Sequence, residues 1–498
     1  MAERGLVIGA RIASGTMAAG VAALTILVVG LVPFPATQAT PRSLTIEPAL
    51  ADQVRVCPGS AVRLGDEFGG AADTAFALGT PAISADVVEG ELERLRLTSA
   101  DAAADASRAP EVLRVPATDG AVVGGAQLQD VDAPDFRGLT AAACTEPSGS
   151  IWLVGGATTV GRSTLLLLSN PTSVPSQVSL EIFGEEGSVS APGMTGIDVP
   201  AGGQVVLSLA GFAPGVASPV VHVMARGGRV TAELQLAIVR GLDSVGVELV
   251  GAGSEPSAAL VVPGVRIADS IGTSRASALS DWQDVLPSVR LAVPGDADGT
   301  VTVRVVPEGA DAEGTTFVVQ VKAGTVSDIP LDAGDQEGEH THGLEDGFYT
   351  VFVDADVPVV AGVRTSTAVD VGEEAAAEPD ALLDAPPSDL AWFGAAPLLT
   401  GAALVVVPQG PAPMMSFVNP TADDAEIELA SRAGGVDPVL VTVPAGAATT
   451  LAVDAGSYLV SGSEGLAISV SYADAGMLAA FVISPARPLA GPIVVHPD

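Results

Sequence analysis

The chain has 498 residues, with 59 acidic side chains against 22 arginine and lysine side chains, and a formal net charge of -37. This length predicts about three domains of ordinary size. Because so acidic a surface repels nucleic acid and anionic headgroups, we expect no nucleic-acid role.

The first predicted element is an uncharged, mostly apolar stretch from Ile12 to Val32. As a helix it would be about 32 Å long, which is enough to cross a bilayer. Arg4 and Arg11 precede it, so the positive-inside rule keeps residues 1–11 in the cytoplasm. We therefore expect a transmembrane anchor at 12–32 and a single-pass membrane protein whose bulk is extracytoplasmic.

A cleaved signal peptide is the alternative, because Thr37-Gln38-Ala39 places small residues before a possible cut. The apolar run exceeds the usual signal-peptide core of about 7 to 15 residues, which favours the uncleaved anchor. Both alternatives export the rest of the chain.

Cys57 and Cys144 are the two cysteines of the chain, and both lie on the exported side. We expect them to form a disulfide, because an oxidising compartment lets one persist. Closing so long a loop stabilises the fold by up to about 4 to 5 kcal/mol in the chain-entropy model. Two buried, unpaired thiols are the alternative.

Short alternating stretches separated by Ala- and Asp-rich loops predict an N-terminal β domain over 43–150. Beyond it, apolar and polar residues alternate with a period of two, as in 178–182, 301–305 and 427–429. One buried and one solvated face per strand is typical of antiparallel sheets, so we expect an all-β fold of tandem immunoglobulin-like β-sandwiches. A propeller-like arrangement is the alternative. The three predicted sandwiches are 151–265, 281–370 and 390–498. An acidic linker, 371–389, is predicted between the last two.

A short phrase repeats along this region. Asn170-Pro171-Thr172 leads to Val199-Pro200-Ala201-Gly202, and Asn419-Pro420-Thr421 leads to Val443-Pro444-Ala445-Gly446. A weaker third copy is Val321-Lys322-Ala323-Gly324. Proline cannot donate to a β ladder, so Asn-Pro predicts the end of a strand. Proline second and glycine fourth suit a type I turn.

Each predicted sandwich also has one tryptophan upstream, at Trp152, Trp282 and Trp392. We interpret these as core anchors, one for each repeat. Sugar sites usually offer exposed aromatic platforms, and aromatic residues are only 4% of this chain. A glycan-binding protein is therefore the less favoured function, which an exposed Trp392 or Tyr349 beside a groove would support.

The stretch from Cys144 to Gly264 contains a series of short motifs: Cys144, Trp152-Leu153-Val154-Gly155-Gly156, Gly161-Arg162-Ser163, Asn170-Pro171, Val199-Pro200-Ala201-Gly202 and Val261-Val262-Pro263-Gly264. With these residues the stretch resembles the DUF5719 family of actinobacterial envelope proteins. The resemblance implies an N-terminal membrane segment, a long β-rich exported region, and a role beside glycosyltransferases in envelope assembly. It supplies no catalytic residues.

Gly156 to Ser163 differs from a phosphate-binding loop by one residue, with Arg162 where the loop needs lysine. Such a loop opens a helix, whereas the apolar run at 164–168 predicts a buried strand. We therefore expect a glycine-rich hairpin and no nucleotide binding.

Two acidic loops raise the question of a metal site. His340 and His342 lie among carboxylates, and a solvated loop is favoured over a cation site because no third ligand is fixed. Asp296-Ala297-Asp298-Gly299 resembles the start of a calcium loop but lacks the closing glutamate, so an ordinary turn is expected. We expect neither a metal nor another cofactor.

No Gly-x-Ser-x-Gly or Ser-x-x-Lys motif indicates a nucleophile. His222 lies in a β-type run and is expected on the solvated face. We therefore expect a non-catalytic envelope scaffold without catalytic residues, binding an envelope protein or glycan. A carboxylate-based hydrolase is the second alternative, and two facing carboxylates of raised pKa in a cleft would support it.

Overall fold

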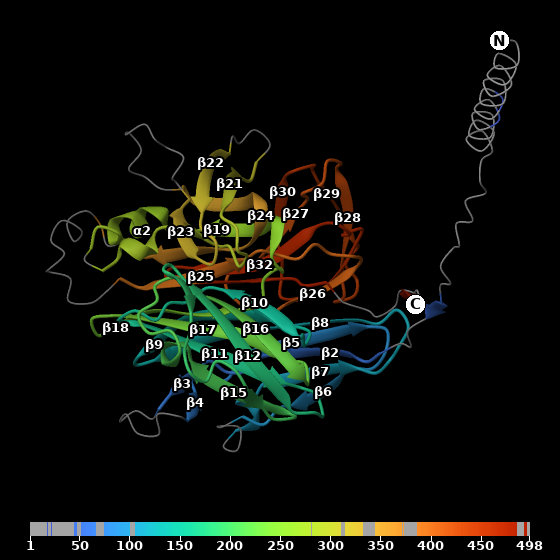
Figure 1. The fold of residues 1–498 in the computed structure, drawn as a ribbon, viewed down its shortest axis with the longest axis horizontal. Coiled ribbons are helices and arrows are strands. Elements are labelled where there is room, and N and C mark those ends of the chain that lie inside the picture. Colours follow the sequence, from blue (N-terminus) through green and yellow to red (C-terminus); the bar gives the residue numbers. More distant parts are fainter. Residues whose placement is uncertain are drawn as a thin grey trace, which may run out of the picture. The chain divides into compact units, whose positions relative to one another are not determined.

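The computed structural model describes residues 17, 21, 44–46, 51–65, 74–99, 105–279, 281–309, 314–331, 344–370, 372, 386–485 and 493–495. They form antiparallel sheets, and the one α helix in the described parts of 51–485 is α2 (Ser270–Ala276), as Figure 1 shows. The predicted all-β class is confirmed. Apart from Met17 and Val21, the predicted anchor at 12–32 lies outside the described residues. None of the helices within those residues has the length and apolar character to span a bilayer.

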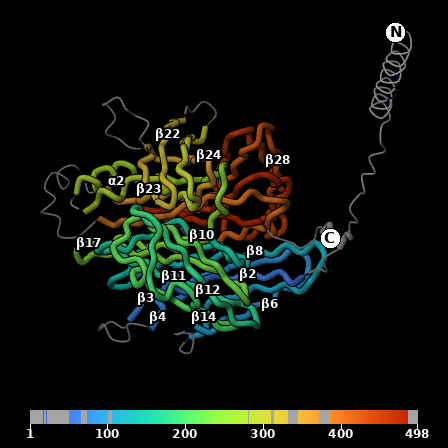
Figure 2. The backbone as a smooth tube through the Cα atoms, viewed as in Figure 1, coloured from blue at the N-terminus to red at the C-terminus, as the bar shows by residue number. Residues whose placement is uncertain are grey.

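The chain divides into two compact parts. One comprises residues 1–49 and 489–498, and there β1 (Leu44–Ile46) pairs with β34 (Ile493–Val495). The other part, residues 50–488, is called the body below. Figure 2 traces its backbone, with the N-terminal strands in blue and the last strands in red.

The N-terminal group of the body has three small sheets, ordered β2-β7-β6, β5-β8-β9 and β3-β4. The disulfide between Cys57, at the end of β2, and Cys144, just after β9, joins the first two sheets and confirms the predicted pairing. Both cysteines are fully buried beside Leu113 and Val115. The strands of this group are β2 (Gln53–Cys57), β3 (Val62–Leu64), β4 (Ala75–Ala77), β5 (Ala82–Val88), β6 (Glu93–Arg96), β7 (Glu111–Val115), β8 (Val122–Ala133) and β9 (Phe136–Ala143).

Three larger units follow. The first contains β10 (Ser150–Val154), β11 (Arg162–Asn170), β12 (Ser176–Gly184), β13 (Gly187–Val189), β14 (Ile197–Val199), β15 (Gly203–Ser208), β16 (Val220–Gly227), β17 (Thr231–Arg240) and β18 (Asp243–Val250). The second contains β19 (Ser257–Ile267), β20 (Ser288–Ala292), β21 (Gly299–Pro307), β22 (Thr315–Val321), β23 (Val326–Pro330), β24 (Gly347–Ala368) and β25 (Ser388–Gly394). The third contains β26 (Ala403–Val407), β27 (Met414–Val418), β28 (Ala425–Ser431), β29 (Val439–Val443), β30 (Ala448–Ala452), β31 (Gly456–Ser461), β32 (Ala467–Asp474) and β33 (Met477–Val482).

The three units share one strand order. The first pairs a sheet β10-β16-β12-β14 with a sheet β15-β11-β17-β18, and the third repeats this as β26-β31-β28-β29 and β30-β27-β32-β33. The second has β19-β24-β21-β22 and β23-β20-β24-β25. Its 22-residue strand β24 runs through both sheets and joins them into one curved sheet. The sequence repeat is therefore visible as a repeated topology.

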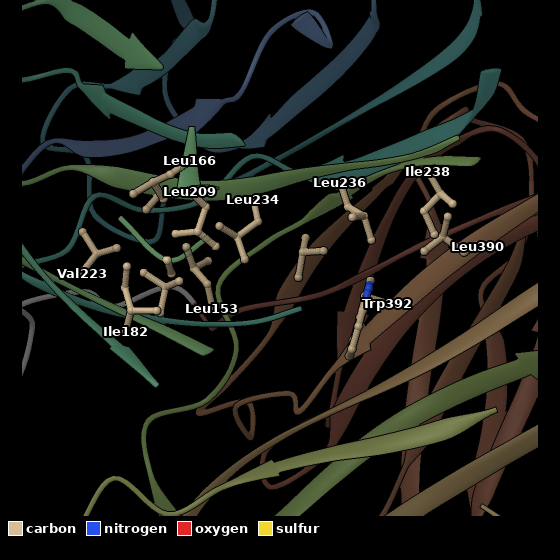
Figure 3. Close-up of a cluster of buried hydrophobic side chains, with 14 of the residues drawn as sticks. Leu153, Leu166, Ile182, Leu209, Val223, Leu234, Leu236, Ile238, Leu390 and Trp392 are labelled. Carbon is tan, nitrogen blue, oxygen red and sulfur yellow. The ribbon is translucent and has the colours of Figure 1, made fainter. Parts of the chain in front are cut away.

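Each unit encloses its own core between two sheets. In the first unit Leu153 and Ile182 of one sheet share a core with Leu166 and Leu234 of the other (Figure 3). Comparable clusters fill the second and third units. Two sheets over one core make a β-sandwich-like unit, unlike the single sheet of the propeller blade that was the alternative.

The tryptophans do not follow the predicted pattern of one per core. All three are buried, but Trp282 and Trp392 both pack into the core cluster of the first unit. Figure 3 shows Trp392 in this cluster. Trp152 instead lies on the outer face of β10, against Val326 and Val360 of the second unit. The reason is that neighbouring units cover these strands, so large side chains fill the spaces between sheets.

The observed limits of the units also differ from the predicted ones. Strand β25 begins at Ser388, inside the predicted linker 371–389, and pairs with β24. Trp392 therefore belongs to the second unit, although it lies in the predicted third sandwich 390–498. Likewise β19 starts at Ser257, within the predicted first sandwich 151–265, and it too pairs with β24.

One edge strand from each of the four groups meets the others at Asp389. Its carboxylate accepts hydrogen bonds from the backbone N–H groups of Leu139 on β9 (2.7 Å), Leu478 on β33 (3.1 Å) and Leu390 on β25 (2.9 Å). Strand β18 comes close as well, since a Cβ on its Gly246 would lie 2.3 Å from a Leu390 side-chain atom. This junction, which includes β9, β18 and β25 in Figure 1, holds the body together.

Candidate functional site

A recess of about 510 Å³ opens where the four groups of the body come together. The N-terminal group contributes Glu146, the first unit Ser150, the second unit Phe352 and the third unit Pro420. Because these residues are far apart in the sequence, the recess forms only in the assembled body. Its size lies in the range of small-molecule and side-chain pockets.

The recess has an apolar floor and a charged rim. Leu260 and Phe352 belong to the floor, and the Arg304 guanidinium lies 4.3 Å from the centre of the Phe352 ring. This cation–π contact fixes Arg304 along the wall of the recess. The charged groups that line it are Glu146, Arg229, Glu255, Arg304 and Asp354. Carboxylates thus outnumber guanidinium groups at the recess.

Ser150, His222 and Glu181 form a hydrogen-bonded chain at this recess. The Ser150 Oγ lies 3.0 Å from His222 Nε2, and His222 Nδ1 lies 2.9 Å from Glu181 Oε2. The three residues come from neighbouring strands of one sheet, in which His222 is opposite both Trp152 and Glu181. The His222 ring stacks on the Trp152 ring, with centroids 4.1 Å apart.

This order of groups matches a serine–histidine–acid relay, but its surroundings oppose acyl transfer. The Glu255 carboxylate lies 3.5 Å from the Ser150 Oγ, the atom that would act as the nucleophile. A negative charge there disfavours the oxyanion that an acyl-transfer site must stabilise. The Ser150 N–H donates to the Ser148 Oγ at 3.2 Å and is already used. The hydrogen-bonded set of Ser150, His222 and Glu181 is therefore better suited to bind a polar group than to act as a nucleophile in acyl transfer.

Sequence reasoning placed His222 on a strand but missed its partners. Alternation already assigned Glu181 to the outward face of its strand. The register between strands, which aligns Glu181 with His222, was the missing information. His222 is on the outward face as expected, yet its side chain is only 13% exposed because Trp152 covers it.

Two buried carboxylates with raised pKa, Asp389 and Glu248, do not line the recess. Burial raises the pKa of Asp389, and burial together with the charge of Asp389 raises the pKa of Glu248. Both side chains are at most 1% exposed at the four-strand junction. They are therefore closed to a substrate, and this pair gives no support to a carboxylate-based hydrolase.

The other candidate residues have structural surroundings. Gly156 to Ser163 leads into strand β11, as the sequence predicted. The Asp298 carboxylate accepts a hydrogen bond from the Ala323 N–H at 2.9 Å, which ties the predicted turn to the third copy of the repeated phrase. Trp392 and Tyr349 are 3% and 8% exposed and offer no open aromatic platform.

His340 and His342 lie outside the described residues. Among the residues that the structure does describe, no cluster of three His, Cys, Asp or Glu side chains is arranged to hold a metal ion. The recess itself brings together carboxylates with guanidinium groups.

A model of a protein family matches residues 98–456, from the N-terminal group into the third unit. The chain belongs to DUF5719, a family of unknown function. No curated protein matches this DUF5719 chain. The crystal structure of Thermotoga maritima 1070 is 16% identical over 24% of this chain and 86% of that chain, with a TM-score of 0.18. The BSP domain of a biofilm associated protein is 8% identical over 90% of this chain and 93% of that chain, with a TM-score of 0.11.

Proposed function

We propose that this DUF5719 chain is a non-catalytic scaffold of the bacterial cell envelope that binds a partner protein in the recess. The observation that carries the proposal is the lining of the recess by all four groups of the body. A site built in this way is sensitive to the assembly of the whole body. The three units, taken as immunoglobulin-like modules, serve to hold its walls in place.

The same proposal places the body outside the cytoplasm. Residues 12–32 serve as the transmembrane anchor, with residues 1–11 on the cytoplasmic side. The buried disulfide between Cys57 and Cys144 supports export, because disulfides persist in oxidising compartments.

The partner that suits the recess presents an apolar side chain flanked by basic residues. The apolar floor, with Leu260 and Phe352, favours an apolar anchor. The excess of carboxylates at the rim favours a positive neighbour, and the net charge of -37 would speed its approach. We take the partner to be an envelope protein, a glycosyltransferase in particular, so that the chain is accessory to envelope assembly.

Site-specific photo-crosslinking in native membranes tests this proposal. Leu398 lines the recess and is 44% exposed, so a photoreactive amino acid there should capture the partner. Leu242, which is 93% exposed in the turn after β17, is the matched control because it does not line the recess. We expect one protein to be captured from position 398 and not from 242.

The identity of the captured species decides between functions. A glycosyltransferase supports the accessory role. Wall glycan captured without protein indicates the alternative, a glycan-binding protein. Equal capture from positions 398 and 242, or none from either, would contradict binding in the recess.

A further inference from the structure

Four arginines gather between the first and second units, away from the recess. Arg162 lies on β11 and Arg240 on β17 of the first unit, whereas Arg290 lies on β20 and Arg364 on β24 of the second. We call these four residues the arginine cluster. None of them lines the recess.

Three of the four arginines have carboxylate partners. Asp284, in the short helical turn 283–285, accepts from Arg162 Nε at 3.0 Å and from Arg240 Nη2 at 2.6 Å. Asp328 on β23 accepts from Nε and Nη2 of Arg290, at 2.7 and 2.8 Å. Arg290 is 1% exposed and lies 4.6 Å from the centre of the Trp392 ring. This part of the cluster is a well-paired packing contact.

Arg364 differs from the other three. Within the described residues it has no ion pair, and its buried Nε has no hydrogen-bond partner. It lies directly opposite Ser288 on one neighbouring strand and Trp392 on the other. The Ser288 Oγ and the Trp392 Nε1 are also buried without a partner. Arg240 Nε and Nη1 are two further buried donors of this kind.

Buried donors without acceptors are costly, at about 1 to 3 kcal/mol each and more when charged. Native proteins rarely leave them, and each one calls for an explanation. Here the unpartnered donors are neighbours: Ser288, Arg364 and Trp392 form one row across three strands. An acceptor that binds between them would satisfy several at once.

The charge of the cluster favours an anion as that acceptor. Burial lowers the pKa of Arg364, and the charges of Asp328 and Asp284 only partly oppose this. Arg290 and Arg162 add to the lowering by repulsion. Four guanidinium groups thus share two direct carboxylate partners, and a surplus of positive charge is left in a partly buried place. The chain has 59 acidic side chains, yet none of those in the described residues forms an ion pair with Arg364.

The cluster can be reached from solvent. The side chain of Arg162 is 19% exposed, and those of Asp284 and Asp328 are 24% and 26% exposed. This edge of the arginine cluster is therefore partly open to solvent.

We infer that the arginine cluster binds a phosphate group, with Arg364 as its main ligand and the neighbouring donors of Ser288 and Trp392 completing the site. Phosphate suits it because the planar guanidinium fork pairs with two phosphate oxygens at once. The group belongs either to free inorganic phosphate or to a phosphomonoester carried by a larger molecule. This site is independent of the partner proposed for the recess.

The test is a titration of the full chain with inorganic phosphate at constant ionic strength, with chloride as the reference ion. Tryptophan fluorescence reports binding because Trp392 adjoins the site, and the midpoint of thermal unfolding should rise with phosphate concentration. Arg364→Gln should weaken binding on the order of tenfold or more, which corresponds to about 1.4 kcal/mol per factor of ten. Arg226→Gln, which removes an exposed arginine of β16, is the matched control and should bind as the wild type does.

A second readout separates a binding role from a structural one. Without phosphate, Arg364→Gln should unfold at a higher temperature than the wild type, because it removes a guanidinium group whose burial disfavours its charge more than Asp328 and Asp284 favour it. Arg364→Lys keeps the charge, loses the fork, and should bind phosphate more weakly. Equal responses of wild type and Arg364→Gln to phosphate, or no response beyond that to chloride, would overturn the inference.

The source of the phosphate group follows from a parallel titration with glucose 1-phosphate. Binding at least as tight as that of inorganic phosphate supports a group carried by a larger molecule. Binding of the inorganic ion alone supports free phosphate as the ligand.

Discussion

The side-chain amide of Asn419 donates a hydrogen bond to the backbone carbonyl of Val443 at 3.0 Å. Asn170 makes the same bond to Val199, at 3.2 Å. Each asparagine also accepts from the threonine two residues later, through both its N–H and its hydroxyl. These are the two asparagines of the whole chain, and both are fully buried. The two halves of the repeated phrase are therefore one hydrogen-bonded unit that joins a strand end to a distant turn.

Replacing Asn419 with alanine should lower the free energy of unfolding by about 2 to 4 kcal/mol, because it orphans buried carbonyls and the Thr421 N–H. Asn170→Ala should have an effect of similar size, since its contacts are the same. Urea unfolding at neutral pH measures both. A large loss in one variant and none in the other would show that the two phrases are not equivalent.

The disulfide between Cys57 and Cys144 closes a loop with a sequence separation of 87 residues. The double variant Cys57→Ala/Cys144→Ala should lose about 4 to 5 kcal/mol of stability in the chain-entropy model, because the unfolded chain regains its freedom. Denaturant unfolding of both proteins without reductant measures the loss. Adding reductant should bring the wild type toward the variant and leave the variant unchanged.

Glu233, on β17, is 1% exposed, and burial raises its pKa to about 8, against a weak hydrogen bond from the Thr145 hydroxyl. Above pH 4.5 the unfolded chain releases this proton, whereas the folded chain keeps it up to about pH 8. The contribution of Glu233 to stability is therefore greatest below pH 4.5, and it falls by about 1.4 kcal/mol per pH unit until pH 8.

Glu233→Gln should flatten this fall, since glutamine has the same shape and no proton to lose. Urea unfolding between pH 5 and 8 measures the slope for wild type and variant. Glu426→Gln, at an exposed position of β28, is the control and should keep the wild-type slope. An unchanged slope in Glu233→Gln would mean that Glu233 ionises in the folded state.

The sequence predicted those elements that depend on local pattern. Alternation located the strands that became β12, β21 and β28, because one face of each is solvated. It failed at β25, where six of seven residues are buried and no alternation remains. That is why Trp392 was assigned to the wrong unit: the face it occupies is covered by the first unit.

The candidate sites depend on contacts that no local pattern records. Ser150 and Glu181 reach His222 only through the register of three strands. Similarly, alternation places an arginine such as Arg364 on one face of a strand. It does not show that another unit covers this face and leaves the guanidinium without a carboxylate. Prediction of either site needs the packing between units.

At the junction of four edge strands, replacing the two buried acids Asp389 and Glu248 should have different effects on stability. Asp389→Asn should destabilise the body although it removes a buried carboxyl group whose pKa is raised by burial. One of the two oxygens that accept from Leu139, Leu478 and Leu390 becomes an N–H donor, and each orphaned backbone donor costs about 1 to 3 kcal/mol.

Glu248→Gln should be neutral or stabilising at pH 7, because burial and the Asp389 charge already raise the pKa of Glu248 and disfavour its ionised form. The sign follows from linkage: a carboxyl group with a raised folded pKa costs stability as the pH rises above its unfolded value, and glutamine removes that cost. Urea unfolding of both variants at pH 5 and pH 7 is the measurement. Asp389→Asn should be less stable than wild type at both values, whereas any gain from Glu248→Gln should be larger at pH 7. Equal losses in the two variants would show that hydrogen bonding at Asp389 does not hold the junction.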